Sequence, residues 1–194
     1  MKPRKGSATG VRVIGGERRG KKLLSVHGLS TRPTADRVRV SIYNIISARI
    51  ANASVLDLYA GTGILGIEAL SRGARFALFI DNSRAPIETI RKNLIACRFE
   101  TRAKVVQYDI QNGLRWLKTD GAPFNLVFVD PPYEQAFVGS TLSHLHDSGA
   151  LSPDALIVVE HSAAAPLIEL PPVFTRMDER NYGKTLVSFI HYTI

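Results

Sequence analysis

The sequence predicts an α/β protein whose sheet is doubly wound and mostly parallel. From residue 55 onwards, segments with β character alternate with segments of helical periodicity. The clearest β segment, residues 124–129, is a short run rich in Val and Phe, as expected of a strand buried on both faces. The last two β segments have no helix between them, so we expect an antiparallel hairpin at one edge of the sheet.

The spacing of apolar residues sets the expected elements. Strands are expected at residues 55–59, 75–80, 104–108, 124–129 and 155–159. Helices are expected at residues 64–71, from residue 86 to about residue 97, at 113–117 as a short helix, and at 137–145. The helix after Pro86 should face the core with Ile87, Ile90, Leu94 and Cys97. The closing β segments cover residues 174–178 and 186–192, with a turn at 181–183.

Composition divides the chain into three parts: a basic leader (1–10), a basic N-terminal extension (11–50) and an α/β domain (51–194). In the extension, residues 11–24 read as a hairpin that turns at Gly15-Gly16. Thr34 is then expected to cap a helix, which should bury one face formed by Val38, Ile42, Ile45, Ile46 and Ile50.

The positive charge is concentrated at the N-terminal end. The chain has a net charge of +8, but residues 1–50 hold 12 Lys and Arg against 2 Asp and Glu, whereas the remainder has a net charge of −2. This asymmetry indicates a segment that binds a polyanion, although a solubilising basic tail would also explain residues 1–10. The candidate phosphate contacts are Arg12, Arg18, Arg19, Lys21, Lys22, Arg32, Arg37 and Arg39.

Other broad features favour a reducing cytoplasm. No apolar run is long enough to span a membrane, and no apolar segment follows the basic N-terminus as in a secretory signal. Cys97 is the single cysteine, which leaves no internal disulfide and no cysteine-based metal cluster. The histidines are scattered along the chain, so we expect no metal, and a monomer is our default expectation.

The most informative motif is Asp130-Pro131-Pro132-Tyr133, which follows the expected strand 124–129. Ligands of open α/β sheets bind where parallel strands end. The prolines stiffen the backbone and donate no hydrogen bond, so the Asp130 carboxylate and the Pro131 carbonyl form a rigid pair of acceptors beside the Tyr133 ring. Such an arrangement suits a planar group that carries an NH₂. The alternative is a strand-ending turn with a helix-capping Asp.

A glycine-rich loop follows the first expected strand and contains G-x-G-x-x-G at Gly61, Gly63 and Gly66. This pattern with Asp81 twenty residues later is typical of dinucleotide binding, but it also fits S-adenosylmethionine, which has a ribose and an adenine and no pyrophosphate. A negative charge on Asp57 would repel a pyrophosphate and would suit an ammonium or sulfonium. Candidate cofactor contacts are Asp57, Tyr59, Ala60, Gly61, Thr62, Gly63, Asp81 with its neighbour Asn82, and Asp109 with its neighbour Ile110.

These motifs resemble a known family. Residues 57–63, Asp81 and residues 130–133 are similar to those of class I S-adenosylmethionine-dependent methyltransferases. The strings Arg12-Val13-Ile14-Gly15-Gly16 and Arg32-Pro33-Thr34-Ala35-Asp36-Arg37-Val38-Arg39 resemble the RsmD family, over roughly residues 11–192. Departures are Val40, where an acid is frequent, and the lack of a second acid after Asp81.

The resemblance implies a seven-stranded, Rossmann-like sheet with an antiparallel last strand. It also implies transfer of a methyl group from S-adenosylmethionine to N2 of a guanine in bacterial 16S rRNA, free or within an assembling small ribosomal subunit. The residues leave other functions open: a methyltransferase for an adenine or cytosine amine of DNA or RNA, an RNA-binding module with a vestigial cofactor pocket, or an NAD-dependent dehydrogenase.

Overall fold

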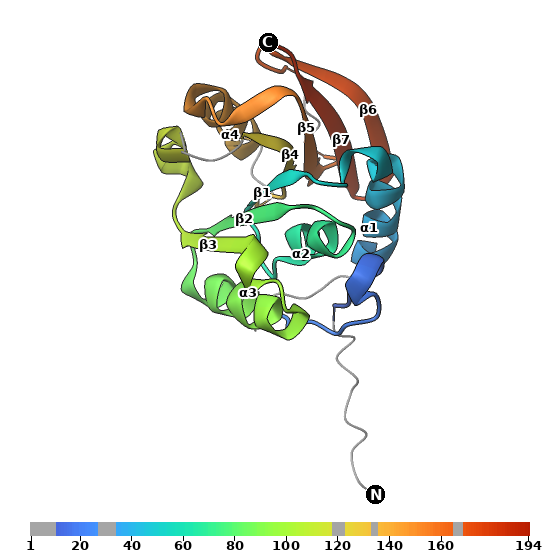
Figure 1. Cartoon of the computed structure of the whole chain (residues 1–194). Coiled ribbons are helices and arrows are strands. Elements are labelled where there is room, and N and C mark those ends of the chain that lie inside the picture. The colour runs from blue at the N-terminus through green and yellow to red at the C-terminus, as the bar shows by residue number, and fades with distance from the viewer. Residues whose placement is uncertain (1–10, 27–33, 118–122, 133–135, 165–168) are drawn as a thin grey trace, which may run out of the picture.

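The computed structural model describes residues 11–26, 34–117, 123–132, 136–164 and 169–194 and centres on one seven-stranded sheet (Figure 1). The strand order is β3-β2-β1-β4-β5-β7-β6. Strands β1 to β5 pair in parallel, and β7 runs antiparallel to both β5 and β6. Their bounds are β1 Ser54–Leu58, β2 Phe76–Asp81, β3 Ala103–Gln107, β4 Phe124–Val129, β5 Leu151–Ser162, β6 Phe174–Tyr182 and β7 Thr185–Tyr192. The predicted fold class is confirmed.

Helices cover both faces of the sheet (Figure 1). The α-helices are α1 Thr34–Ile45, α2 Ile64–Ser71, α3 Arg84–Cys97 and α4 Ala136–Ser148. One core contains apolar residues of α1, α2 and α3, and the other contains residues of α4 and of the 3₁₀ segments η4 and η5. The 3₁₀ segments are η1 Gly16–Arg18, η2 Ser47–Arg49, η3 Glu100–Arg102, η4 Ile110–Asn112 and η5 Arg115–Leu117. No helix in the described ranges is long and apolar enough to cross a membrane.

Several predicted boundaries were wrong by a few residues. Strand β5 extends well beyond 155–159, because its bulged pairing with β4 begins at Leu151. The closing turn lies at residues 183–184, since Tyr182 still pairs with Thr185. Helix α1 begins at Thr34 rather than after it, and Ile45, which was expected on the buried face, is 41% exposed.

Residues 11–26 form the predicted hairpin, but with a single β-bridge instead of two regular strands. Arg12 and Lys22 make this antiparallel bridge, and the Val13 N–H donates to the Lys21 carbonyl over 3.0 Å. Val13 and Leu23 are buried in the same core as α1 and α2. The basic extension therefore packs directly on the α/β body.

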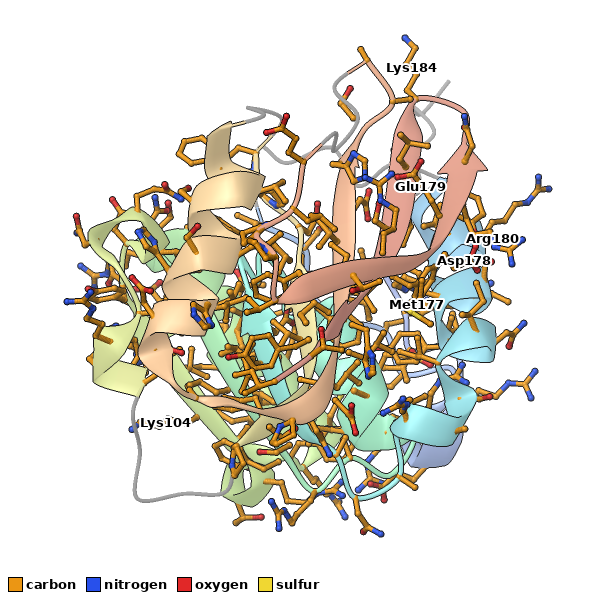
Figure 2. The ribbon with its side chains drawn as sticks, turned by 90° about the horizontal axis from the view of Figure 1, so that it is seen from above. Lys104, Met177, Asp178, Glu179, Arg180 and Lys184 are labelled. Carbon is orange, nitrogen blue, oxygen red and sulfur yellow. The ribbon has the colours of Figure 1, made fainter. Side chains whose placement is uncertain are left out.

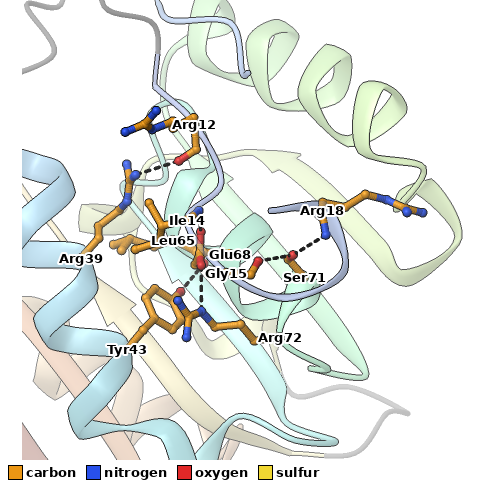
Figure 3. A network of polar contacts seen from close by, with 10 residues as sticks. All are labelled: Arg12, Ile14, Gly15, Arg18, Arg39, Tyr43, Leu65, Glu68, Ser71 and Arg72. Carbon is orange, nitrogen blue, oxygen red and sulfur yellow. Dashed lines mark hydrogen bonds and ion pairs between the residues drawn. The ribbon is translucent and has the colours of Figure 1, made fainter. Parts of the chain in front are cut away.

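Glu68 of α2 attaches the hairpin to the body (Figure 3). Its side chain is fully buried, and its carboxylate accepts from the Ile14 N–H and from Arg72 Nε, each over 2.7 Å. The Arg72 guanidinium lies 4.8 Å from the centre of the Tyr43 ring of α1. Because a buried carboxylate needs such partners, these contacts fix the hairpin and α1 relative to α2.

The two edges of the sheet carry charged side chains (Figure 2). Lys104 lies on the edge strand β3. At the other edge, β6 carries Asp178, Glu179 and Arg180 next to a register shift, and Met177 there is 66% exposed. Charges and bulges at sheet edges disfavour pairing with another chain.

Candidate active site

The site lies where β1, β2 and β4 end. Strand β1 lies between β2 and β4, with Leu58 beside Ile80 on one side and Val129 on the other. The connection from β1 to β2 contains α2 on one face of the sheet, whereas η4 and η5, which precede β4, lie on the other face. The carboxyl ends of β1 and β4 therefore form the topological switch point of the sheet. The glycine loop, Asp81 and Asp130 therefore come together at one place.

A cavity of about 480 Å³ opens at this edge. Among the described residues that line it, three are carboxylates and none is Lys or Arg. Such a cavity suits a ligand with hydroxyl, amine or cationic groups and disfavours a pyrophosphate. The lining residues are Tyr59, Gly61, Asp81, Asn82, Ser83, Pro86, Asp109, Gln111, Asp130, Pro131, Pro132 and Phe137.

Backbone amides hold Asp81 in place at the end of β2. The Gly61 N–H donates to its Oδ2 and the Ser83 N–H donates to its Oδ1, each over 3.0 Å. Asp81 is 9% exposed, so its carboxylate is fixed at the wall of the cavity rather than free in solvent. A carboxylate fixed in this way can accept hydrogen bonds from a pair of ribose hydroxyls.

The glycine loop turns sharply between β1 and α2. Gly61 has φ +55° and Gly63 has φ +75°, which glycine adopts without strain. Gly66 lies against the Phe79 ring, so a Cβ at this position would collide with it. The loop therefore needs these glycines for its conformation and for close packing of α2 on the sheet.

Asp57 does not line the cavity. It shares the face of β1 that packs under α2, where it is 1% exposed and accepts from the Gly66 N–H over 2.8 Å. Burial raises the pKa of Asp57 from 3.8 to about 8, and the nearby Asp81 charge adds to this effect. At neutral pH the carboxyl group of the ligand-free protein is mostly protonated. The expectation of a second fixed negative charge at Asp57 is therefore corrected. The preference for a cationic ligand over a pyrophosphate rests instead on the carboxylates that line the cavity.

Other predicted cofactor residues lie around the cavity without lining it: Ala60, Thr62, Gly63 and Ile110. The Ile110 side chain is 2% exposed and belongs to the apolar core on the α4 side. Tyr133, the fourth residue of the D-P-P-Y motif, lies outside the described residues.

A polar network that sequence reasoning missed supports the cavity wall. The Tyr59 hydroxyl bonds with Thr141 Oγ1 over 2.8 Å and accepts from Gln111 Nε2 over 2.7 Å. Ser140 Oγ donates to Gln111 Oε1 over 2.8 Å. The network joins the glycine loop to α4, and the only sequence signal for it is that Gln111 lies two positions after Asp109.

Asn93 of α3 was also missed, and it links the basic hairpin to the glycine loop. Its buried amide accepts from the Leu24 N–H over 2.7 Å and donates to the Leu24 carbonyl over 3.1 Å and to the Thr62 carbonyl over 3.0 Å. A polar residue within the otherwise apolar face of α3 was the available signal. The position of the glycine loop thus depends on docking of the hairpin.

The predicted phosphate contacts differ in accessibility. Arg12, Arg19, Lys21, Lys22 and Arg37 are exposed on the hairpin and on α1. The prediction for Arg39 was wrong, because its side chain is 4% exposed and donates to the Arg12 carbonyl and to Asp36. Arg18 is half-buried, and its Nε donates to the Cys97 carbonyl over 2.6 Å. Arg32 lies outside the described residues.

Comparison with known proteins agrees with this arrangement. A family model described as "Conserved hypothetical protein 95" matches residues 11–191. Ribosomal RNA small subunit methyltransferase D of Escherichia coli (strain K12) is 37% identical over 94% of this chain and 90% of its own length. The Haemophilus influenzae protein of the same name is 36% identical over 94% of this chain and 93% of its own length. The solved structure of yhhF from Escherichia coli has a TM-score of 0.84 at 34% identity and covers 95% of this chain and 98% of that chain.

The seven-stranded sheet with its antiparallel last hairpin and the site at the switch point define the class I S-adenosylmethionine-dependent methyltransferase fold. The resemblance noted from the sequence motifs is confirmed over nearly the whole chain. The chain belongs to the family described as Conserved hypothetical protein 95, which is the RsmD family.

Proposed function

We propose that this protein transfers a methyl group from S-adenosylmethionine to the exocyclic N2 amine of a guanine in bacterial 16S rRNA. The observation that carries the proposal is the shared cavity, which is lined by the Asp130-Pro131-Pro132 segment together with Gly61 and Asp81. A base amine and a methyl donor can therefore occupy neighbouring parts of one space. The names of the E. coli and H. influenzae relatives support small-subunit rRNA as the substrate.

The lining residues fit S-adenosylmethionine better than a dinucleotide. We assign the Asp81 carboxylate to the ribose hydroxyls and Asp109 to the adenine amine, and both residues line the cavity. Pro86 and Phe137 supply apolar surface. When bound, S-adenosylmethionine supplies an electrophilic methyl group on a sulfonium, and the electrons of its S–C bond return to sulfur on transfer.

The chain itself holds and orients the amine. The Asp130 carboxylate and the Pro131 carbonyl accept the two N–H groups, so the nitrogen lone pair points across the cavity. Guanine's amine is a weak nucleophile because its lone pair is delocalised into the ring, and fixed acceptors that favour a pyramidal nitrogen raise its reactivity. The proton released from nitrogen passes to Asp130 or to water. Tyr133, by its place after the two prolines, is assigned to stack on the base.

The exposed cations of the basic hairpin and of α1 supply contacts to RNA phosphates, which position the substrate without reading its sequence. A monomer in a reducing cytoplasm stays the working expectation for the protein. Methylation of an adenine or cytosine amine is the second candidate, because the same pair of acceptors serves all three amines.

Mapping of methylated nucleotides in rRNA incubated with the protein and labelled S-adenosylmethionine tests the proposal. A single N2-methylguanine in 16S rRNA is the expected result, and transfer to adenine or cytosine alone would refute it. Calorimetry with S-adenosylmethionine and with NAD tests the cofactor separately, and binding of NAD alone would refute the assignment of the cavity.

Two substitutions of Asp130 test its role. Asp130→Ala should lower kcat by at least about 100-fold while leaving the Kd values for cofactor and RNA within about threefold of wild type. Asp130→Asn keeps one acceptor oxygen but has no charge, so its kcat should lie between those of the wild type and Asp130→Ala. Unchanged kcat in both variants would contradict the proposed mechanism.

A further inference from the structure

A second cavity, of about 490 Å³, lies beside the first. It is formed where η4 and η5 lie against α4, on the sheet face opposite α2 and α3 (Figure 1). Its volume is within the range of small-ligand sites. The lining residues are Tyr108, Gln111, Asn112, Gly113, Leu114, Arg115, Trp116, His144 and Asp147.

Aromatic rings form part of this cavity's wall. Tyr108 and Trp116 meet edge to face, with ring centres 5.1 Å apart and planes at 62°. Trp116 is 38% exposed, although most of the large apolar residues that the structure describes are buried. Because a nucleobase binds aromatic rings by stacking, an accessible indole held against a second ring is a suitable platform for one.

The polar groups in the wall match a base attached to a phosphate. His144 Nδ1 lies 3.1 Å from the Ile110 carbonyl, which can only accept, so Nδ1 carries the hydrogen and Nε2 of the neutral ring is an acceptor. The Arg115 guanidinium lies 3.5 Å from the Asp147 carboxylate. Because the Arg115 side chain is 82% exposed, it remains accessible to a phosphate.

Gln111 is shared by the two cavities. Its amide is held at both ends, by the Tyr59 hydroxyl and by Ser140, so the wall between the cavities is fixed. A ligand in the second cavity therefore lies next to the cavity that is proposed to hold the cofactor and the target base. Among the described residues that line the second cavity, none is an equivalent of the strand-end carboxylates Asp81 and Asp130, so this lining does not match a cofactor with a ribose and a sulfonium.

We propose that the second cavity binds an unstacked base of the substrate RNA, close in the strand to the methylated nucleotide, with its ring on Trp116 and its phosphate near Arg115. This inference rests on the proposed function, because it assumes that RNA enters the first cavity. It adds a second base contact to the one proposed for the target base, and so supplies part of the register that phosphate contacts cannot read.

Trp116 is the single tryptophan of the chain, so intrinsic fluorescence reports on this cavity directly. Titration of the full chain with poly(A) should quench and shift the emission, whereas polyphosphate, which has the charge without bases, should leave it nearly unchanged. S-adenosylhomocysteine should also leave it nearly unchanged. Equal responses to poly(A) and polyphosphate, or quenching by S-adenosylhomocysteine that competes with poly(A), would overturn the proposal.

Two variants test the cavity through activity on 16S rRNA. Trp116→Leu retains apolar volume without a stacking face, and it should raise the KM for RNA by about 5- to 150-fold with little change in kcat or in cofactor Kd. Trp116→Phe retains a ring, and its KM should stay within about fivefold of wild type. Equal KM values for wild type and Trp116→Leu would overturn the inference. Quenching by poly(A) without any methylation of rRNA would refute the proposed function but not the base-binding cavity. Methylation of rRNA without quenching by poly(A) would refute the base-binding cavity but not the proposed function.

Discussion

Replacement of Asp57 by asparagine should stabilise the ligand-free protein, and the gain should increase with pH. Asp57 is 1% exposed, and burial raises its pKa from 3.8 to about 8. Between these two values the unfolded chain carries an ionised Asp57 while the folded protein must protonate it. The contribution of Asp57 to stability is therefore fully present below pH 3.8 and is lost as pH rises, until the folded carboxyl group ionises near pH 8.

The size of the effect follows from the shift. Each pH unit between about 4 and about 8 should cost the wild type about 1.4 kcal/mol relative to a variant that does not titrate. Asparagine has nearly the same shape as a protonated Asp57, and its carbonyl can still accept from the Gly66 N–H. The difference in unfolding free energy between Asp57→Asn and the wild type should therefore grow by about 4 kcal/mol as the pH rises from 5 to 8.

Urea unfolding of both proteins at pH 5, 6, 7 and 8, without cofactor, measures this difference. If the two proteins give parallel curves of unfolding free energy against pH, Asp57 is ionised with an ordinary pKa and the reasoning is refuted. A cationic cofactor near Asp57 should bind the wild type more tightly as pH rises toward 8, and this dependence should be absent in Asp57→Asn.

Three further predictions concern packing and charge. Glu68→Ala should lower the unfolding free energy by about 3–5 kcal/mol in urea, because it removes the buried partner of the hairpin, while Glu68→Gln should cost about 1–2 kcal/mol. Gly66→Ala should lower stability by about 1–3 kcal/mol through collision with the sheet, whereas Gly139→Ala, in the open on α4, should raise it by up to about 1 kcal/mol; equal effects in thermal unfolding would contradict this account of the glycine loop. Lys21→Ala should reduce the slope of log RNA affinity against log salt by about 0.7–0.9, and Arg39→Ala should instead lower stability and leave that slope unchanged.

Much of the architecture was readable from the sequence. Strand β4 and helix α2 have the predicted bounds, because the period of apolar residues depends on local backbone geometry alone. The β-α order requires parallel strands, and parallel strands have their carboxyl ends at one edge of the sheet. Asp81 and Asp130 could therefore be assigned to the same site before any coordinates were known.

The tertiary structure decided what depends on contacts between distant residues. Asp57 and Asp81 look alike as acids near strand ends, and the register places them on the same face of the sheet, but Asp57 lies within β1 under α2 whereas Asp81 ends β2 at the cavity wall. Arg37 and Arg39 are two positions apart on α1, and the turn of the helix exposes the first while the second is buried against the hairpin. A sequence pattern records periodicity along one segment, whereas burial and hydrogen-bond partners depend on which other segments pack against it. Those partners set the charge of a carboxyl group and the accessibility of a cation in this protein.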